Sequence, residues 1–82
     1  MGFIFPDNSH LMDIRSPAGT RVRYRGAGGY ESNVEMANEW LEVGAVYVVD
    51  STDIGAWRTD VYLKEFPGIG FNSVMFEKEE QR

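Results

Sequence analysis

The segment DVYLKEFPGIGFNSVMFE (residues 60–77) decides the fold of this chain. In its first part, Val61 and Leu63 alternate with polar residues, which is the two-residue period of a strand with one buried face. Pro67-Gly68 then marks a tight turn, because proline fixes φ at about −65° and glycine tolerates positive φ. The pattern predicts two antiparallel strands on either side of this turn.

The end of the same segment predicts a tight helical turn between two short strands. Residues 69–71 should fold back on the strand before the turn. Asn72-Ser73 then interrupts the apolar pattern and suits a single turn of tight helix. Residues 74–77 are apolar enough to form a last short strand.

Two more strands are predicted upstream. Residues 20–24 alternate, with Val22 and Tyr24 on one face and Arg21, Arg23 and Arg25 on the other. Residues 46–49 form a dense β-branched and aromatic run, which is typical of a central strand. The chain is therefore mainly β, with four to five strands.

A short helix is expected between these two strands. Ser32 and Glu35 have the spacing of a capping box, which predicts that Ser32 is the N-cap. Val34, Ala37 and Leu41 share one helical stripe, so a helix through about residue 41 would pack one side on the sheet. Closure of the strands into a small barrel would remove exposed edges, and the alternative is a curled open sheet with the helix across one face.

In its order of elements, the range 20–77 resembles the Src-homology-3-like small barrel. Residues 60–77 are similar to the late strand, turn, tight helix and closing strand of such barrels. The same segment, together with Gly44-Ala45-Val46-Tyr47, also resembles small proteins encoded in bacteriophage and prophage genomes. The acidic loop and paired-aromatic signature of the peptide-binding signalling domains has no counterpart here, so the resemblance does not extend to proline-motif recognition.

The 82 residues leave room for one domain. We expect an N-terminal arm or extra strand over residues 1–19, the small barrel over 20–77 and a charged tail over 78–82. The chain has no cysteine, so the apolar core alone must stabilise it. A homo-oligomer stays possible, because a domain of this size buries a modest share of its surface.

Net charge and hydropathy limit the classes of partner that this protein is expected to bind. The formal net charge of −5 opposes binding to nucleic acid or to an anionic membrane. No stretch is apolar enough to span a bilayer, and the first residues lack the features of a secretory signal. We therefore expect a cytoplasmic protein, located in the host cell if a phage encodes it.

The sequence offers no recognisable catalytic or metal-binding pattern. His10 is the only histidine, and it lies among turn residues, where a solvated side chain is the simpler interpretation. A nucleophile with a base, a pair of carboxylates at hydrolytic spacing and a His/Cys metal set are all missing as patterns. We predict a protein that is not an enzyme and has no cofactor.

A basic stripe and a glycine loop give one alternative function. Arg21, Arg23 and Arg25 could grip an anion, and Gly26-Ala27-Gly28-Gly29 follows them as a phosphate loop would. The loop lacks the spacing of a nucleotide-binding motif, and the arginines could equally pair with carboxylates of the same chain. A small-molecule or nucleotide site on these residues is the alternative hypothesis.

The leading hypothesis rests on segregated charge and on spare aromatic side chains. Residues 26–57 contain six acidic residues and no lysine or arginine. Four aromatic side chains are not assigned to the core by alternation, and such residues are common interface anchors. We predict a phage-derived interaction module that binds, and modulates or inhibits, a host or phage protein, although a solvated acidic face would look the same. The predicted contact residues are Trp57, Tyr62, Tyr30, Trp40, Glu35 and Glu39.

Overall fold

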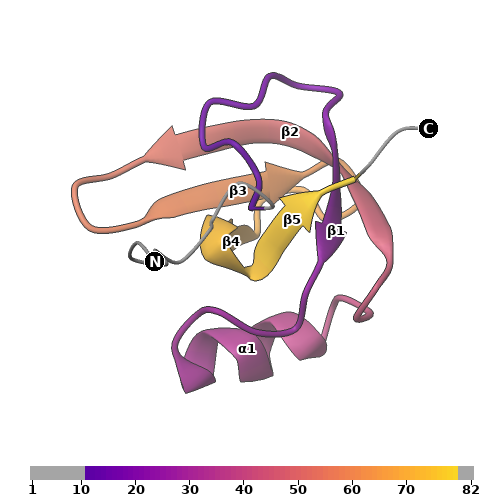
Figure 1. Ribbon diagram of the computed structural model, residues 1–82, viewed down its shortest axis with the longest axis vertical. Helices are drawn as coiled ribbons and strands as arrows, with labels where there is room; N and C mark the ends of the chain where they lie inside the picture. The colour runs from indigo at the N-terminus through magenta and orange to yellow at the C-terminus, as the bar shows by residue number, and fades with distance from the viewer. Residues whose placement is uncertain (1–10, 80–82) are drawn as a thin grey trace, which may run out of the picture.

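The computed structural model describes residues 11–79 (Figure 1). It contains β1 (Arg21–Tyr24), α1 (Glu31–Asn38), β2 (Val46–Ile54), β3 (Thr59–Leu63), β4 (Gly70–Asn72), η1 (Ser73–Met75, a 3-10 helix) and β5 (Phe76–Lys78). The expected N-terminal arm and charged tail lie partly outside the described residues, and His10 lies wholly outside them. The mainly β class with one short helix after the first strand is confirmed.

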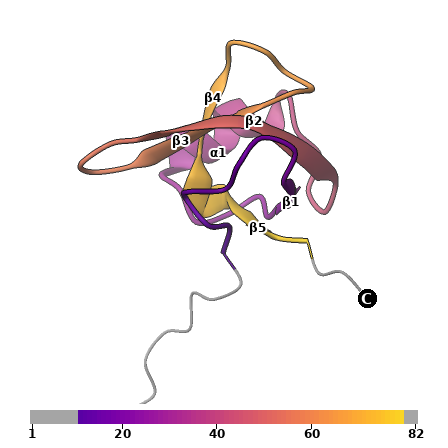
Figure 2. The ribbon, with the colours of Figure 1, turned by 90° about the horizontal axis from the view of Figure 1, so that it is seen from above.

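All strands form one antiparallel sheet in the order β4-β3-β2-β1-β5. The long strand β2 pairs with two strands: Val46 and Val48 lie opposite β1, whereas Ile54 lies opposite Thr59 of β3. The register shifts between Val49 and Ser51, which makes a bulge there. A bulge bends its strand and increases the twist, and β2 curves accordingly in Figures 1 and 2.

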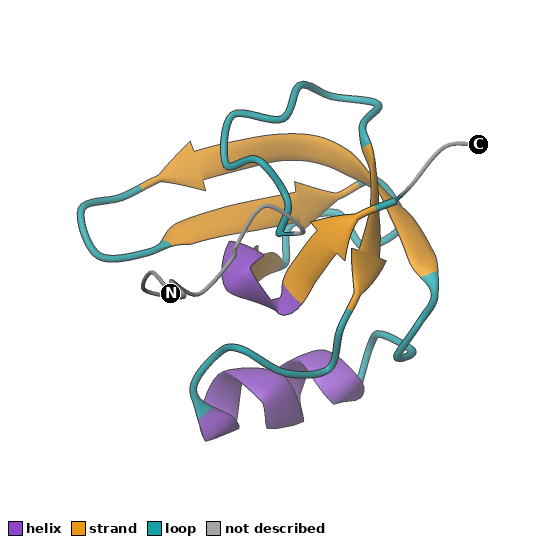
Figure 3. Cartoon of the chain, viewed as in Figure 1, coloured by secondary structure: helices purple, strands orange, loops and turns teal. Residues whose placement is uncertain are grey.

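The sheet is not closed, so the expectation of a closed barrel is wrong. Strands β4 and β5 are its two edges, and η1 connects them along the chain (Figure 3). In β5, Glu77 has Arg23 opposite it on one side and Leu11 on the other. The amide of Met12 also donates to the carbonyl of Phe76 at 3.1 Å. Residues 11–12 therefore occupy the β5 edge that closure would have paired with β4.

The core takes side chains from every strand, from α1 and from η1. The predicted alternation is confirmed, since Val22, Tyr24, Val61 and Leu63 are all buried. Each such side chain stabilises the fold by about 1.5–3 kcal/mol through removal of apolar surface from water. The other buried apolar residues are Met12, Ala37, Leu41, Val49, Phe71, Met75 and Phe76.

Helix α1 begins two residues earlier than the sequence predicted. Tyr30, not Ser32, is the N-cap, and the Asn33 side-chain oxygen accepts from the Tyr30 amide at 3.3 Å. The Ser32–Glu35 capping box is therefore wrong, because Asn33 already supplies the returning side chain three residues after Tyr30. The helix ends at Asn38, and Leu41 is buried in the turn that follows.

Hydrogen bonds fix both ends of α1 to the rest of the fold. The Tyr24 hydroxyl donates to Asn38 Oδ1 at 2.7 Å, and Asn72 Nδ2 donates to Asn33 Oδ1 at 3.3 Å. Tyr30 precedes this anchored helix directly, so its backbone position is well defined. The other boundary correction concerns residues 74 and 75, which belong to η1 and not to the last strand.

Candidate functional site

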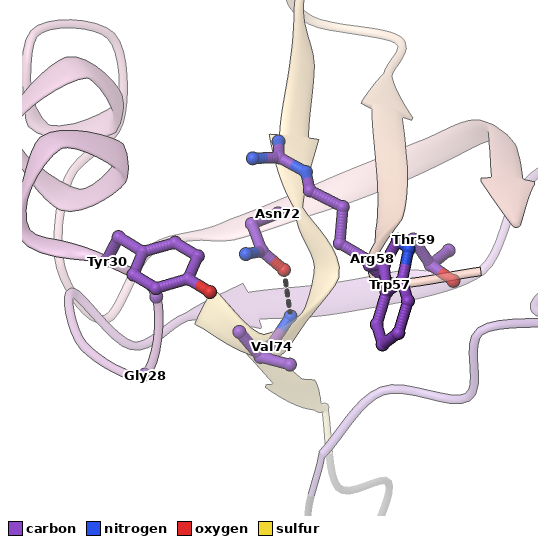
Figure 4. A pocket seen from close by; sticks show the side chains of 8 residues that line it. Gly28, Tyr30, Trp57, Arg58, Thr59, Asn72 and Val74 are labelled. Atoms are coloured by element: carbon purple, nitrogen blue, oxygen red, sulfur yellow. Dashed lines mark hydrogen bonds between the residues drawn. The ribbon is translucent and has the colours of Figure 1, made fainter. Parts of the chain in front are cut away.

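A groove of about 360 Å³ lies between three segments that are far apart in the sequence. These are the glycine loop before α1, the turn between β2 and β3, and the start of η1. Figure 4 shows Tyr30 on one side of the groove and Trp57 on the other, with Asn72 and Val74 between them. The lining residues are Gly28, Gly29, Tyr30, Trp57, Arg58, Thr59, Asn72 and Val74.

The two aromatic walls of the groove are strongly exposed. Trp57 is 99% exposed and Tyr30 is 78% exposed. Trp57 stands in a tight turn that the Gly55 amide closes by donating to the Arg58 carbonyl at 3.0 Å. A side chain at position 55 would approach that carbonyl to 2.7 Å, so the turn requires glycine. The hairpin thus presents Trp57 to solvent on a constrained backbone.

The floor of the groove is a close approach of backbone to backbone. Gly28 has φ of +104°, and a Cβ there would lie 2.6 Å from the Val74 carbonyl oxygen. Arg25 Nη1 donates to that same oxygen at 2.9 Å. Asn72 Oδ1 accepts from the Val74 amide at 3.3 Å, which caps η1. These contacts hold the glycine loop, and so the Tyr30 wall, against η1.

The hairpin wall carries a small excess of negative charge. Arg58 Nε donates to Asp60 Oδ1 at 2.7 Å, and Asp53 lies opposite Asp60 on the neighbouring strand. Both partners of the ion pair are about one-third exposed, so it contributes little to stability. One carboxylate in excess of the single guanidinium remains beside the groove.

The family described as bacteriophage T4 protein Y07B matches residues 20–82. The chain belongs to this family. The sequence-based resemblance to bacteriophage proteins is therefore confirmed. A search of curated proteins and a search of solved structures find no match. The Y07B match covers every described strand and helix, and every residue that lines the groove.

The Y07B-family fold brings together only some of the predicted contact residues. Tyr30 and Trp57 form the two walls of the groove. Tyr62 is half-buried on β3, where a Cβ added to Gly70 would lie 3.2 Å from its ring. Trp40 is half-exposed and packs edge-on against Phe66, with ring centroids 6.0 Å apart. Glu35 and Glu39 are exposed, and neither lines the groove.

The arginine stripe does not converge on one point. Arg21 Nε contacts Glu79 Oε2 at 2.7 Å, Arg23 lies opposite Glu77 of β5, and Arg25 binds the carbonyl beside Gly28. Along a strand, residues 21 and 25 are about 13 Å apart. Arg21 lines a separate hollow of about 240 Å³. Only Arg25 reaches the glycine loop, so the alternative anion site is not assembled from all three.

Sequence reasoning missed the groove residues Arg58, Thr59, Asn72 and Val74. The sequence around these residues predicted only a strand, a turn or a tight helix. Nothing in the local sequence indicates that they lie beside the glycine loop. Within residues 11–79, no group of acidic or histidine side chains could hold a metal ion. No helix in this part of the chain is long and apolar enough to cross a membrane.

Proposed function

We propose that this Y07B-family chain is a non-enzymatic interaction module that binds a protein through the groove between Tyr30 and Trp57. One observation carries the proposal: two large aromatic side chains, 99% and 78% exposed, wall a single groove. Tryptophan and tyrosine at the centre of an interface supply much of its binding energy, because they bury large area at low cost in side-chain entropy.

The rigidity of the groove supports the same function. Its floor is fixed by the contact of Gly28 with the Val74 carbonyl, and its hairpin wall by the Gly55–Arg58 turn. A preformed site avoids part of the ordering cost of association, so a larger share of the contact energy appears as affinity. The formal net charge of −5 disfavours nucleic acid as the partner.

We propose that this open sheet is a relative of the Src-homology-3-like small barrels. Support comes from the strand order β4-β3-β2-β1-β5 and from the 3-10 helix between the last two strands.

The partner is a host or phage protein in the host cytoplasm, and the bound module modulates or inhibits it. The phage family supports this choice of partner.

Site-specific photo-crosslinking tests the proposal. Benzoylphenylalanine replaces Tyr30 in one variant and Ile14 in a control variant, since Ile14 is also exposed but does not line the groove. Both proteins are irradiated in lysate of phage-infected host cells, and the crosslinked proteins are identified by mass spectrometry. We expect a specific product from the probe at position 30 and none from the probe at position 14.

The variant Trp57→Ala shows whether that product depends on the groove. Loss of an interface anchor costs about 2 kcal/mol of binding energy, which weakens affinity about 30-fold. Folding stability should stay within about 0.5 kcal/mol of the parent, because Trp57 buries almost nothing in the free protein. A product that forms equally from both probe positions, or that survives Trp57→Ala, would exclude the groove.

A further inference from the structure

A second aromatic surface lies away from the groove, just beyond the C-terminal end of α1. Trp40 packs edge-on against Phe66 at 6.0 Å, and Tyr47 packs against the same ring at 5.9 Å between centroids. Trp40 is 50% exposed, and Tyr47 and Phe66 are partly buried. Phe66 also contacts the fully buried Phe71 edge-on at 6.5 Å. The end cluster, Trp40, Tyr47 and Phe66, is therefore an exposed platform supported by the core.

Three exposed glutamates adjoin the end cluster. Glu39 directly precedes Trp40. The Glu42 amide donates to the Tyr47 hydroxyl at 2.9 Å, which places Glu42 beside that ring. The Glu65 carboxylate accepts from the Val48 amide at 3.0 Å and so lies beside residue 47.

The charge around the end cluster is strongly one-sided. On the side of α1 and β2, no cation is available from residues 26–57, which contain no lysine or arginine. Lys64, next to Glu65, is the one cation adjacent in sequence to these glutamates. Three carboxylates therefore outnumber the one ammonium that neighbours them in sequence, and Arg23, opposite Val46 on β2, has Glu77 of β5 on its other side.

Aromatic rings beside carboxylates favour a particular kind of binding partner. The face of an aromatic ring attracts a cation, most often arginine, and carboxylates bind guanidinium through paired hydrogen bonds. A second copy of this chain would bring like charges face to face, and nucleic acid or an anionic membrane would be repelled. A positively charged protein segment satisfies both the rings and the carboxylates.

We propose that the end cluster, with Glu39, Glu42 and Glu65, docks an arginine-bearing segment of a protein partner. None of these six residues lines the groove. The surface is therefore a second docking site, and the proposal does not depend on the groove. Two sites on one small domain would let it hold two segments of one partner, which raises the effective affinity without any new contact.

Single-tryptophan variants test the proposal, because the chain contains only two tryptophans. Trp57→Phe leaves Trp40 as the sole tryptophan, and Trp40→Phe leaves Trp57. The probe is the acetylated and amidated peptide Gly-Arg-Leu-Arg-Gly, and its matched control carries citrulline in place of arginine. Citrulline keeps the shape of arginine and lacks its charge. Peptide is titrated into each variant, and tryptophan fluorescence is recorded.

We expect a saturable change in the fluorescence of Trp40 with the arginine peptide and no saturable change in that of Trp57. Binding of the citrulline peptide should be at least about tenfold weaker. Glu39→Gln and Glu42→Gln should each weaken binding of the arginine peptide. Glu31→Gln, which makes the same charge change at the other end of α1, should not. We expect circular dichroism to show that these exposed substitutions leave the fold intact.

Several results would overturn the proposal. Equal affinity for the arginine and citrulline peptides would show that the site does not select a cationic segment. An unchanged affinity of the Glu39→Gln and Glu42→Gln variants for the arginine peptide would show that these carboxylates do not take part in binding. A change in Trp40 fluorescence with protein concentration alone, together with a dimer in sedimentation, would identify a second copy as the occupant. An equal response of Trp57 would show unspecific binding.

Discussion

Replacing Gly28 with alanine should destabilise the fold and distort the groove at the same time. Gly28 has φ of +104°, which costs an L-residue about 1–3 kcal/mol. The new Cβ would also lie 2.6 Å from the Val74 carbonyl oxygen, a backbone atom that cannot simply rotate away. The Cβ would also lie 3.1 Å from Arg25 Nη1, so it crowds the guanidinium that donates to this carbonyl at 2.9 Å and weakens that hydrogen bond. A hydrogen bond from a charged group contributes about 1.5–3 kcal/mol.

Gly19 provides the matched control for this substitution. Its φ is +94°, close to that of Gly28, and a Cβ there would meet no atom within 4 Å. Gly19→Ala therefore carries the backbone strain alone, whereas Gly28→Ala carries the strain and the collision. Urea unfolding followed by circular dichroism should show Gly28→Ala to be less stable than Gly19→Ala by about 1.5–3 kcal/mol. Equal losses in the two variants would refute the close contact between the loop and η1.

Three further outcomes follow from burial, charge and pKa. Phe71→Ala should cost about 3–5 kcal/mol in urea unfolding, whereas Trp57→Ala should cost less than about 0.5 kcal/mol, because Phe71 is fully buried and Trp57 is not. Burial, and to a smaller extent the charge of Tyr47, raises the pKa of Tyr24 in the folded protein above its usual value of 10.0. The Tyr24 hydroxyl therefore contributes its full stability below pH 10, the pKa in the unfolded chain, and this contribution is lost as the pH rises toward the raised pKa of the folded state. Stability curves at pH 8 to 11 should therefore fall less steeply for Tyr24→Phe than for the parent. Arg21→Gln should cost about 1–3 kcal/mol, because the Glu79 side chain that pairs with Arg21 is only 14% exposed and its carboxylate would lose its charged partner, and a loss of less than about 0.5 kcal/mol would contradict this.

The sequence predicted the strands well because burial on one face leaves a clear two-residue period. Val61 and Leu63, and Val22 and Tyr24, were assigned to the core by alternation alone, and all are buried. The bulge in β2 was not predictable, because a register shift depends on which strands pair and not on local propensity. The choice between a closed barrel and the alternative open sheet could not be made for the same reason, since only the fold shows that residues 11–12 occupy the β5 edge.

The candidate site was only partly predictable. Alternation could not decide the exposure of Trp57, because this residue lies in a turn and not on a strand face. Trp40 and Tyr30 looked alike in sequence, yet one packs on Phe66 and the other walls the groove. The sequence does not indicate that Asn72 lies between the two aromatic walls, because that position arises from contacts between segments that are far apart along the chain.

Mapping the contact surface by NMR tests the proposed groove most directly. Uniformly ¹⁵N-labelled protein is titrated with the partner captured by crosslinking, and the Trp57 indole and Asn72 side-chain amide signals report on the groove. We predict that these two signals and the Tyr30 backbone amide show the largest perturbations. Perturbations confined to β1 and β5, around Arg21 and Glu79, would contradict the assignment of the groove as the binding site.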